Sequence, residues 1–380
     1  MDFTLSEEQL MIQQAARDFA QNELLPGIIE RDDAQRFPTD QVKKMGELGF
    51  MGMMVDPKYN GSGLDTLSYV ILMEELSKID ASASVIVSVN NSLVCWGLEH
   101  FGNEEQKQKY LTRLASGEIL GAFCLSEPEA GSDATSQKTT ALDKGDHYIL
   151  NGTKNWITNG STAEVYLVIA QTDKDKGHKG INVLIVEKGM EGFEIGPKEN
   201  KLGIRASDTH SLNFNDVKVP KENRIGEDGF GFKFAMKTLA GGRIGIAAQA
   251  LGIAAGAYEL AKKYAQERKT FGTEIANHQA IAFKLADMHT QIEAARHLVY
   301  KAAWEKDNEL NYDLSSAVAK LYASQVAMET TIEAVQIHGG NGFVKDYHVE
   351  RLMRDAKITQ IYEGTSEIQK IVISRSILKT

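Results

Sequence analysis

The sequence of 380 residues is poor in cysteine and has no excess of positive charge. Its two cysteines, Cys95 and Cys124, indicate no disulfide framework, and a reducing compartment is expected. The net charge of −10 argues against nucleic-acid binding, which requires a basic surface. The opening MDFTLSEEQL lacks a basic segment followed by an apolar one, so we expect no signal peptide and a cytoplasmic protein.

Proline is absent from the last 160 residues, because all six prolines lie in the first 220. This absence is typical of long helices, where proline would remove a hydrogen bond. The first 121 residues also read as helical, and Ser6 and Gln9 have the spacing of a capping box that begins a helix. The longest weakly polar stretch, Ile244–Tyr258, is too short and too rich in glycine and alanine to cross a bilayer. We therefore expect no membrane span.

The middle of the chain has a different pattern. VYLVIAQ (165–171) and INVLIVE (181–187) are β-rich runs separated by a polar loop, and HSLNFNDVKVP (210–220) alternates until its proline. The Asn151–Gly152 pair predicts a tight hairpin turn between two short strands. Several short strands with turn residues indicate a small sheet or barrel.

Together these patterns predict a mainly α protein with a central β-domain. We expect an N-terminal helical domain in residues 1–121, a β-domain in 122–230 and a C-terminal helical bundle in 231–380.

Several common site motifs are missing. The sequence has no HExxH, no GxSxG and no histidine spacing typical of a metal site. GEDGFGFK (226–233) lacks the ending of a phosphate-binding P-loop. HGGNGF (338–343) follows a helix rather than a strand, so it is no Rossmann fingerprint, and by itself it indicates a helix C-cap.

One short segment, QIYEGTSEIQ (360–369), raises a functional question. It places Glu363 directly before Gly364, which we predict to be a helix C-cap. Ser366 and Gln369 have the spacing of a capping box, which predicts a new helix. Glu363 is therefore either a solvated acid beside a cap or a base held against a group that must lose a proton.

Six separate blocks resemble the acyl-CoA dehydrogenase family, most closely its short-chain, butyryl-CoA type, and they extend over essentially the whole chain. The blocks are FCLSEPEAGSD (123–133), NGTKNWITNG (151–160), GGRIGIAAQALGIAAGAYE (241–259), RKTFG (268–272), QIHGGNGF (336–343) and IYEGTSEIQ (361–369). The resemblance implies an N-terminal helical domain, a middle β-barrel-like domain and a C-terminal four-helix bundle. It also implies FAD, oxidation of a short-chain acyl-CoA to the trans-2-enoyl-CoA, electron transfer to electron-transferring flavoprotein, and a homotetramer of paired dimers.

The resemblance assigns the α-proton base to Glu363. Burial beside an acyl chain would raise the pKa of this carboxyl, and so would a nearby helix C-terminus. In the family, the enolate is stabilised by the backbone N–H of the base and a ribityl hydroxyl of FAD. Relatives such as isovaleryl-CoA dehydrogenases carry the base directly before the arginine of the GGR block, where this chain has Gly242. Ala240 stands where short-chain members often have an aspartate.

The resemblance also implies the following contacts. Flavin contacts are Phe123, Leu125, Ser126, Ser132, Trp156, Ile157 and Thr158. Contacts with the rest of FAD, partly across a subunit interface, are Arg268 at the diphosphate, Phe271, Gln279, Gln336, Ile337, His338, Gly339 and Gly340, with Thr365, Ser366 and Glu367 after the base. Substrate contacts are Ser132, Gly242, Arg243 and Gly364. Without the resemblance, Trp156 would read as core packing and Arg268 as a cation that ends a helix.

Three other functions stay open at this point. An acyl-CoA oxidase would share the fold and pass its electrons to oxygen. A branched- or medium-chain acyl-CoA dehydrogenase would differ in acyl specificity. A helical scaffold that has lost its flavin would belong to another class, and a yellow purified protein would exclude it.

Overall fold

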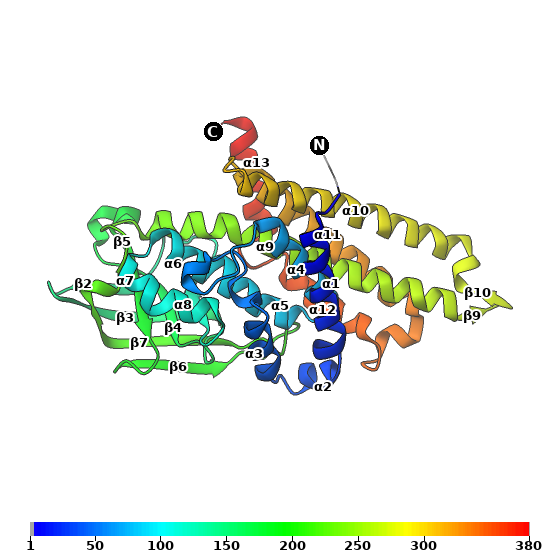
Figure 1. Cartoon of the computed structure of the whole chain (residues 1–380), viewed down its shortest axis with the longest axis horizontal. Helices are drawn as coiled ribbons and strands as arrows, with labels where there is room; N and C mark the ends of the chain where they lie inside the picture. Colours follow the sequence, from blue (N-terminus) through cyan, green and yellow to red (C-terminus); the bar gives the residue numbers. More distant parts are fainter. Residues whose placement is uncertain (1–3, 380) are drawn as a thin grey trace.

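Helices form both ends of the chain and strands form its middle in the computed structural model, which describes residues 4–379 (Figure 1). The N-terminal helices are α1 Glu7–Phe19, α2 Ile28–Asp33, α3 Thr39–Glu47, α4 Thr66–Ile79, α5 Ala81–Ser88, α6 Trp96–Phe101, α7 Glu104–Gln106 and α8 Thr112–Ala115, with the π-helical segments η1 Ala20–Leu24, η4 Val89–Cys95 and η5 Lys107–Leu111. The C-terminal helices are α9 Gly231–Glu267, α10 Gln279–Asp307, α11 Asp313–His338, α12 His348–Ile358 and α13 Ser366–Leu378. The predicted mainly α fold with a central β-domain is confirmed.

The first helix begins as its sequence predicts. The Ser6 hydroxyl accepts a hydrogen bond from the Gln9 N–H at 3.2 Å, and the Gln9 side chain accepts one from the Ser6 N–H at 3.0 Å. Two N–H groups that would otherwise lack partners at the helix start are thereby satisfied.

The strands between residues 121 and 225 form one sheet. They are β1 Gly121–Cys124, β2 Thr140–Asp143, β3 His147–Thr158, β4 Val165–Gln171, β5 Ile181–Glu187, β6 Phe193–Lys198, β7 Thr209–Pro220 and β8 Arg224–Ile225. Their order is β6-β7-β3-β2-β4-β5-β8, and β1 pairs in parallel with β4. A separate two-stranded hairpin, β9 Lys269–Thr270 and β10 Thr273–Glu274, lies at the opposite end of the molecule (Figure 1).

The sheet is buried on both faces where β4 lies. Leu167 and Ile169 belong to the main helical core, whereas Tyr166 and Val168 belong to a second core on the other face. Alternate side chains of a strand point to opposite faces, so a strand covered on both sides must be apolar throughout. This explains why VYLVIAQ is a continuous apolar run.

The Asn151–Gly152 pair corrects one prediction, because it forms no hairpin turn. Both residues lie inside the single 12-residue strand β3, at a shift of its register with β7 between Leu150 and Gly152. Gly152 has φ +143°, and a side chain there would collide with Thr139. Asn215 and Asp216 of β7 both face Asn151 at this shift, so the extra residue of the β-bulge lies in β7 and the Asn151–Gly152 pair lies opposite it. The turn into β3 comes earlier, at Gly145.

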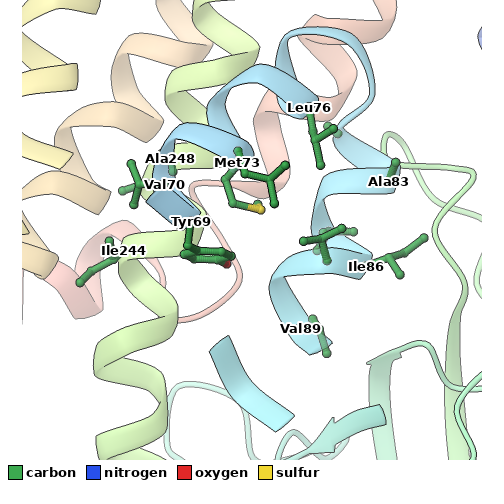
Figure 2. Packing of buried hydrophobic residues seen from close by; sticks show 14 of the residues in the cluster. Tyr69, Val70, Met73, Leu76, Ala83, Ile86, Val89, Ile244 and Ala248 are labelled. Carbon is green, nitrogen blue, oxygen red and sulfur yellow. The ribbon is translucent and has the colours of Figure 1, made fainter. Parts of the chain in front are cut away.

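The helical core is built around α9. Ile244 and Ala248 of α9 pack against Tyr69, Val70 and Met73 of α4 (Figure 2). A Cβ at Gly252 would collide with the Glu74 carbonyl oxygen of α4. A glycine inside a helix costs about 1 kcal/mol relative to alanine, and here it permits the two backbones to approach closely. The helix α11 packs on α9, α10, α12 and α13 and completes the bundle.

Two helical stretches of residues 4–379 are long and apolar enough to cross a membrane by length and composition alone. They are Ala81–Phe101 and α9, and their apolar windows are 94% and 83% buried inside the protein. The expectation that the chain near Ile244–Tyr258 is too short was wrong, because it belongs to a helix of 37 residues. Burial of both windows is typical of core helices. The expectation of no signal peptide rests partly on residues 1–3, which lie outside the described residues.

Candidate active site

Glu363 lies in the turn between α12 and α13. The α12 helix ends at Ile358 with Thr359 as its C-cap. The prediction that Gly364 is a helix C-cap was therefore wrong. The N-cap of α13 is Thr365, whose hydroxyl accepts a hydrogen bond from the Ile368 N–H at 3.3 Å. The predicted capping box of Ser366 and Gln369 was therefore wrong by one residue. Thr365, rather than Ser366, has the side chain that replaces the missing helical acceptor.

The backbone of this turn is left-handed at two consecutive residues. Glu363 has φ +50° and Gly364 has φ +94°. A left-handed conformation costs a residue with a Cβ about 1–2 kcal/mol, so the surroundings must hold Glu363 in place. The Gln369 side chain donates hydrogen bonds to the Glu363 carbonyl at 3.2 Å and to the Gly364 carbonyl at 2.9 Å. Lys320 of α11 donates a further hydrogen bond to the Gly364 carbonyl at 2.6 Å.

The carboxylate of Glu363 lies against Gly242 of α9. A Cβ at Gly242 would collide with Glu363 Oε2 and would lie 2.8 Å from Leu93 Cδ2. Within residues 4–379, Oε2 is buried and has no hydrogen-bond partner. Gly242 therefore provides the space that the carboxylate occupies, and one oxygen of the carboxylate is left for a ligand.

Burial sets the acidity of Glu363. It raises the pKa of this carboxyl to about 7, against the opposing positive charges of Lys320 and Arg243. The predicted contribution of a helix C-terminus is not needed, since desolvation is the main cause. A carboxylate with a pKa near neutrality is a suitable general base at physiological pH. The alternative of a solvated acid beside a helix cap does not fit this burial.

Arg243 is the second charged group at this position. Its side chain is mostly buried, and its Nε has no hydrogen-bond partner in the described part of the chain. Burial lowers the pKa of Arg243, although Asp313 and Glu363 attract its charge. An unpaired buried guanidinium next to the carboxylate can bind an electron-rich group of a substrate.

A buried polar cluster lies next to Glu363 in the sequence and includes its neighbour Tyr362. Gln249 is fully buried on α9, two turns after Gly242, and its amide donates hydrogen bonds to the Ala81 carbonyl at 2.9 Å and the Ser84 hydroxyl at 3.1 Å. The Tyr362 hydroxyl donates a hydrogen bond to the Gln249 carbonyl oxygen. Buried hydrogen bonds are costly to break, so they hold the side chains of Gln249 and Tyr362 in fixed positions.

The residues predicted at the flavin gather where β1 and β3 end. Trp156 is 58% exposed with φ +57°, so it is not a core side chain. Leu125 and Ile157 are buried, Phe123, Ser126 and Thr158 are half-buried, and Ser132 is exposed. The Asn155 N–H donates a hydrogen bond to the Ser126 carbonyl at 2.9 Å, which joins the two segments.

A buried ion pair fixes these two segments together. The Lys154 ammonium donates hydrogen bonds to the Leu125 carbonyl at 3.0 Å, to Glu127 at 2.7 Å and to Gln137 at 3.3 Å. Burial alone would raise the pKa of Glu127, but the Lys154 charge and backbone donors hold it below its ordinary value. Every donor of Lys154 is satisfied, as a buried ammonium requires.

Arg268 lies in a different pocket, of about 490 Å³, at the far end of α9. The structure brings Arg268 together there with Ile337, His338, Gly339 and Gly340, which come from two separate sequence blocks. Side chains at Gly339 and Gly340 would meet nothing within 4 Å, so their backbones are open to a ligand. The other residues lining this pocket are Tyr264, Thr270, Ile275, His278, Ile281 and Asn341.

Three predicted residues near this pocket do not line it. Phe271 is 99% exposed with φ +51°, and Gln279 and Gln336 are also exposed. A fully exposed phenylalanine in a strained backbone conformation is unusual in a monomer and marks a surface that meets another group.

The two groups of site residues lie far apart in one chain. Gly242 and Arg268 are connected by one continuous helix, so they are separated by roughly 40 Å at 1.5 Å per residue. Figure 1 shows the same arrangement, with the sheet at one end of the molecule and the β9–β10 hairpin at the other.

Sequence reasoning missed the residues that surround Glu363, which are Leu93, Gln249, Lys320, Tyr362 and Gln369. Lys320 could have been recognised in the sequence, because a lysine within the mainly apolar helical stretch SSAVAKLYA (Ser315–Ala323) is unusual. Gln369 was noticed, but it was assigned to a cap. Within residues 4–379, no group of three or more His, Cys, Asp or Glu side chains could hold a metal.

Comparisons with known proteins are consistent along the whole chain. Three family models match: the N-terminal domain of acyl-CoA dehydrogenase at residues 6–118, the middle domain at 122–217 and the C-terminal domain at 229–378. The short-chain specific acyl-CoA dehydrogenase of Clostridium acetobutylicum is 54% identical over 379 residues, which is 100% of both chains.

Two solved structures are similar over 100% of both chains. One is butyryl-CoA dehydrogenase from Megasphaera elsdenii, with 49% identity and a TM-score of 0.98. The other is a chain solved in work on the electron transferring flavoprotein of Acidaminococcus fermentans and flavin-based electron bifurcation, with 53% identity and a TM-score of 0.99.

Proposed function

The chain belongs to the acyl-CoA dehydrogenase family, and from this premise we propose that it oxidises short-chain acyl-CoA, such as butyryl-CoA, to the trans-2-enoyl-CoA. The observation that carries the proposal is the half-buried side chain of Glu363, whose carboxylate has a buried oxygen without a partner and a pKa of about 7. Electron transfer to electron-transferring flavoprotein is part of the proposal, supported by the similarity to the Acidaminococcus chain.

Glu363 acts as the α-proton base in this proposal. The α-proton of a thioester is a weak acid, so the base must lie close to it and the developing enolate must be stabilised. No acceptor for the Glu363 N–H exists among residues 4–379, which leaves this donor free for the thioester oxygen. Arg243 and Gly364 would line the substrate beside the base.

The residues present fit FAD in two places. The exposed Trp156, with Phe123, Leu125, Ser126, Ser132, Ile157 and Thr158, would line the flavin, and Thr365, Ser366 and Glu367 would contact the cofactor after the base. Arg268 and the open backbone of Gly339 and Gly340 would bind the diphosphate. When bound, FAD accepts the hydride that leaves the β-carbon.

The separation of these two places supports a shared cofactor site. A distance of roughly 40 Å is far longer than the ribityl chain between a flavin ring and its diphosphate. One chain would therefore bind the flavin of its own FAD and the diphosphate of a neighbour's, with the exposed Phe271, Gln279 and Gln336 at the interface. We propose a homotetramer of paired dimers on this basis.

Arg268→Ala tests the diphosphate assignment. Loss of the guanidinium removes the strongest anion-binding group of the pocket, so flavin content after gel filtration should fall. A matched Lys269→Ala variant, in the exposed hairpin beside it, should keep its flavin. Unchanged flavin content in Arg268→Ala would contradict the assignment.

Short acyl chains are proposed on the similarity to a short-chain specific dehydrogenase. Near Glu363, the side chains of Gln249 and Tyr362 are tied to each other by a hydrogen bond, and Gln249 also donates to the Ala81 carbonyl and the Ser84 hydroxyl. An acyl chain long enough to reach these groups would have to displace them, each at a cost of about 1–3 kcal/mol.

The experiment that tests the function is anaerobic reduction of the purified flavoprotein by a series of straight-chain and branched acyl-CoA substrates. We expect a maximum rate with butyryl-CoA and a decline with longer or branched chains. A maximum with a medium-length or branched chain would reject short-chain specificity. Rapid reoxidation of the reduced enzyme by oxygen would instead favour an oxidase.

A further inference from the structure

Lys320 is a buried lysine that the proposed reaction does not use. It is fully buried on α11, and within residues 4–379 it has no carboxylate within ion-pair distance. Its ammonium donates a hydrogen bond to the Gly364 carbonyl at 2.6 Å. Burial lowers the pKa of Lys320 to about 8, although the charge of Glu363 favours the ammonium form.

An ammonium in this position is costly. Removing a charge from water without an ion-pair partner is strongly unfavourable, and an apolar side chain of similar length would fill the same volume without that cost. Packing therefore does not explain a lysine here, whereas its two neighbours do: the carbonyl of Gly364 and the charge of Glu363.

Lys320 and Gln369 together hold both carbonyls of the left-handed turn. Gln369 donates to the carbonyls of Glu363 and Gly364, and Lys320 donates to that of Gly364. With both carbonyls fixed, the Glu363 N–H stays unpaired and its carboxylate stays against Gly242. The strained backbone at Glu363 would otherwise relax towards ordinary dihedral angles.

Lys320 also belongs to the small set of polar groups around the carboxylate. These are Arg243 from α9, Lys320 from α11, the Tyr69 hydroxyl from α4 and the Tyr362 hydroxyl from the turn itself. Only Arg243 and Lys320 carry charge near neutral pH, and both favour the ionised form of Glu363.

We propose that Lys320 is a positioning residue for the catalytic base: its ammonium fixes the Glu363–Gly364 turn and keeps the carboxylate ionisable near neutral pH. This inference rests on the proposed role of Glu363. It assigns two separable effects to one side chain, a hydrogen bond to the turn and a positive charge near the base.

The test compares the flavin-loaded variants Lys320→Met, Lys320→Arg and Gln369→Leu. Lys320→Met should move the acidic limb of the kcat/KM profile for butyryl-CoA to higher pH by about one unit, which lowers the rate at pH 6 by about tenfold. Lys320→Arg keeps the charge and should return the limb towards wild type. Gln369→Leu should lower the plateau by about tenfold without moving the limb, because it loosens the turn and leaves the charge.

A second readout isolates proton transfer from oxidation. Exchange of the α-hydrogen of a non-oxidisable acyl-CoA analogue with D₂O, followed by mass spectrometry, reports the base alone. We expect its pH dependence to shift in Lys320→Met as the kcat/KM profile does. Lys306→Met is the matched control, because the Lys306 ammonium faces the Trp96 ring and the Met54 sulfur instead of the turn. Its profile and exchange should stay as in wild type.

The outcomes separate this inference from the function it rests on. If Glu363→Gln exchanges the α-hydrogen at the wild-type rate, the proposed base is wrong. A second outcome is slow α-hydrogen exchange in Glu363→Gln together with a wild-type kcat/KM pH profile and wild-type exchange in Lys320→Met. This outcome overturns only the inference about Lys320. If Lys320→Met does not fold, Lys320→Gln replaces it with the same expected shift, and a wild-type limb and exchange rate in Lys320→Gln reject the inference.

Discussion

Two buried lysines hold two loops of this protein, one at the edge of the sheet and one in the helical bundle. Lys154 is paired with Glu127 and donates to two further oxygens, so its charge is compensated on the spot. Lys320 has one carbonyl at hydrogen-bond distance, and its nearest negative charge is the carboxylate of Glu363.

The difference shows how a buried charge is used in each region. A compensated pair fixes geometry and has no charge left to influence a neighbour. An ammonium without an ion-pair partner is less favourable for folding, but its positive charge favours the ionised form of a nearby carboxylate. The sheet region therefore carries a structural lysine beside the segments proposed to line the flavin, and the bundle carries a lysine proposed to act on Glu363.

The largest effect should come from removing the carboxylate of the proposed base. Glu363→Gln keeps the size of the side chain but removes its proton acceptor, so anaerobic flavin reduction by butyryl-CoA should slow by about 10²–10⁴-fold. Flavin content should stay unchanged, because Glu363 is not among the residues proposed to hold FAD. A near wild-type rate in stopped-flow absorbance would show that Glu363 is not the base.

A relocated base provides the matching control. The carboxylate of Glu363 and a side chain at Gly242 compete for the same space, so a glutamate at 242 requires a small residue at 363. The double variant Glu363→Gly with Gly242→Glu should recover part of the lost rate, because both carboxylates would address the same carbon. Gly242→Glu in the wild-type background should instead destabilise the protein through the collision.

Breaking the compensated pair should have the next largest effect, on stability rather than on proton transfer. Lys154→Met leaves Glu127 buried without its cation, which should lower the free energy of unfolding by about 3–5 kcal/mol. The double variant Lys154→Met with Glu127→Gln should recover a substantial part of this loss. Chemical denaturation measures both, and equal losses in the single and double variants would contradict the role of the pair.

The pKa of Glu363 should affect both the reaction rate and the stability of the wild-type protein as the pH changes. Proton abstraction requires ionised Glu363, so kcat/KM should fall tenfold per unit as pH decreases below about 7. The pKa of Glu363 is higher in the folded than in the unfolded chain, so its favourable contribution to stability exists at low pH and is lost as pH rises from 4.5 to about 7. Glu363→Gln should consequently melt at a higher temperature than wild type at pH 8, and a lower melting temperature would contradict this linkage.

The smallest predicted effect concerns the start of α13. Thr365→Ala removes the cap that the structure shows and should cost about 1 kcal/mol, whereas Ser366→Ala should cost less. Thermal denaturation of the two variants compares them directly. A larger loss in Ser366→Ala would favour the capping box that the sequence suggests.

The sequence predicted the order of helices and strands because long-range patterns carry it. The prolines stop at Pro220, and the strands β4, β5 and β7 follow the apolar runs closely. The Asn151–Gly152 turn was wrong because the pair lies inside β3, opposite a bulge of β7, and only the pairing of these two strands shows this.

The candidate site was predicted unevenly for a related reason. Glu363 and Arg268 belong to short blocks that resemble a known family, so both could be predicted as site residues from the sequence. Lys320 and Gln369 act through distances between separate helices, which no local pattern contains. The pocket that unites Arg268 with Gly339 and Gly340 likewise exists only after α9 and α11 pack together.

The unbroken length of α9 has a genetic consequence. The single helix α9 separates Glu363 from Arg268 within one chain. In a dimer that shares its cofactors, each active centre would therefore combine Glu363 of one copy with Arg268 of the other. A Glu363→Gln chain and an Arg268→Ala chain, each defective in its own assembly, would form hybrids in which one of each two centres has both wild-type residues. Two defective alleles of this gene would thus complement each other in the same cell, whereas two alleles with the same defect would not.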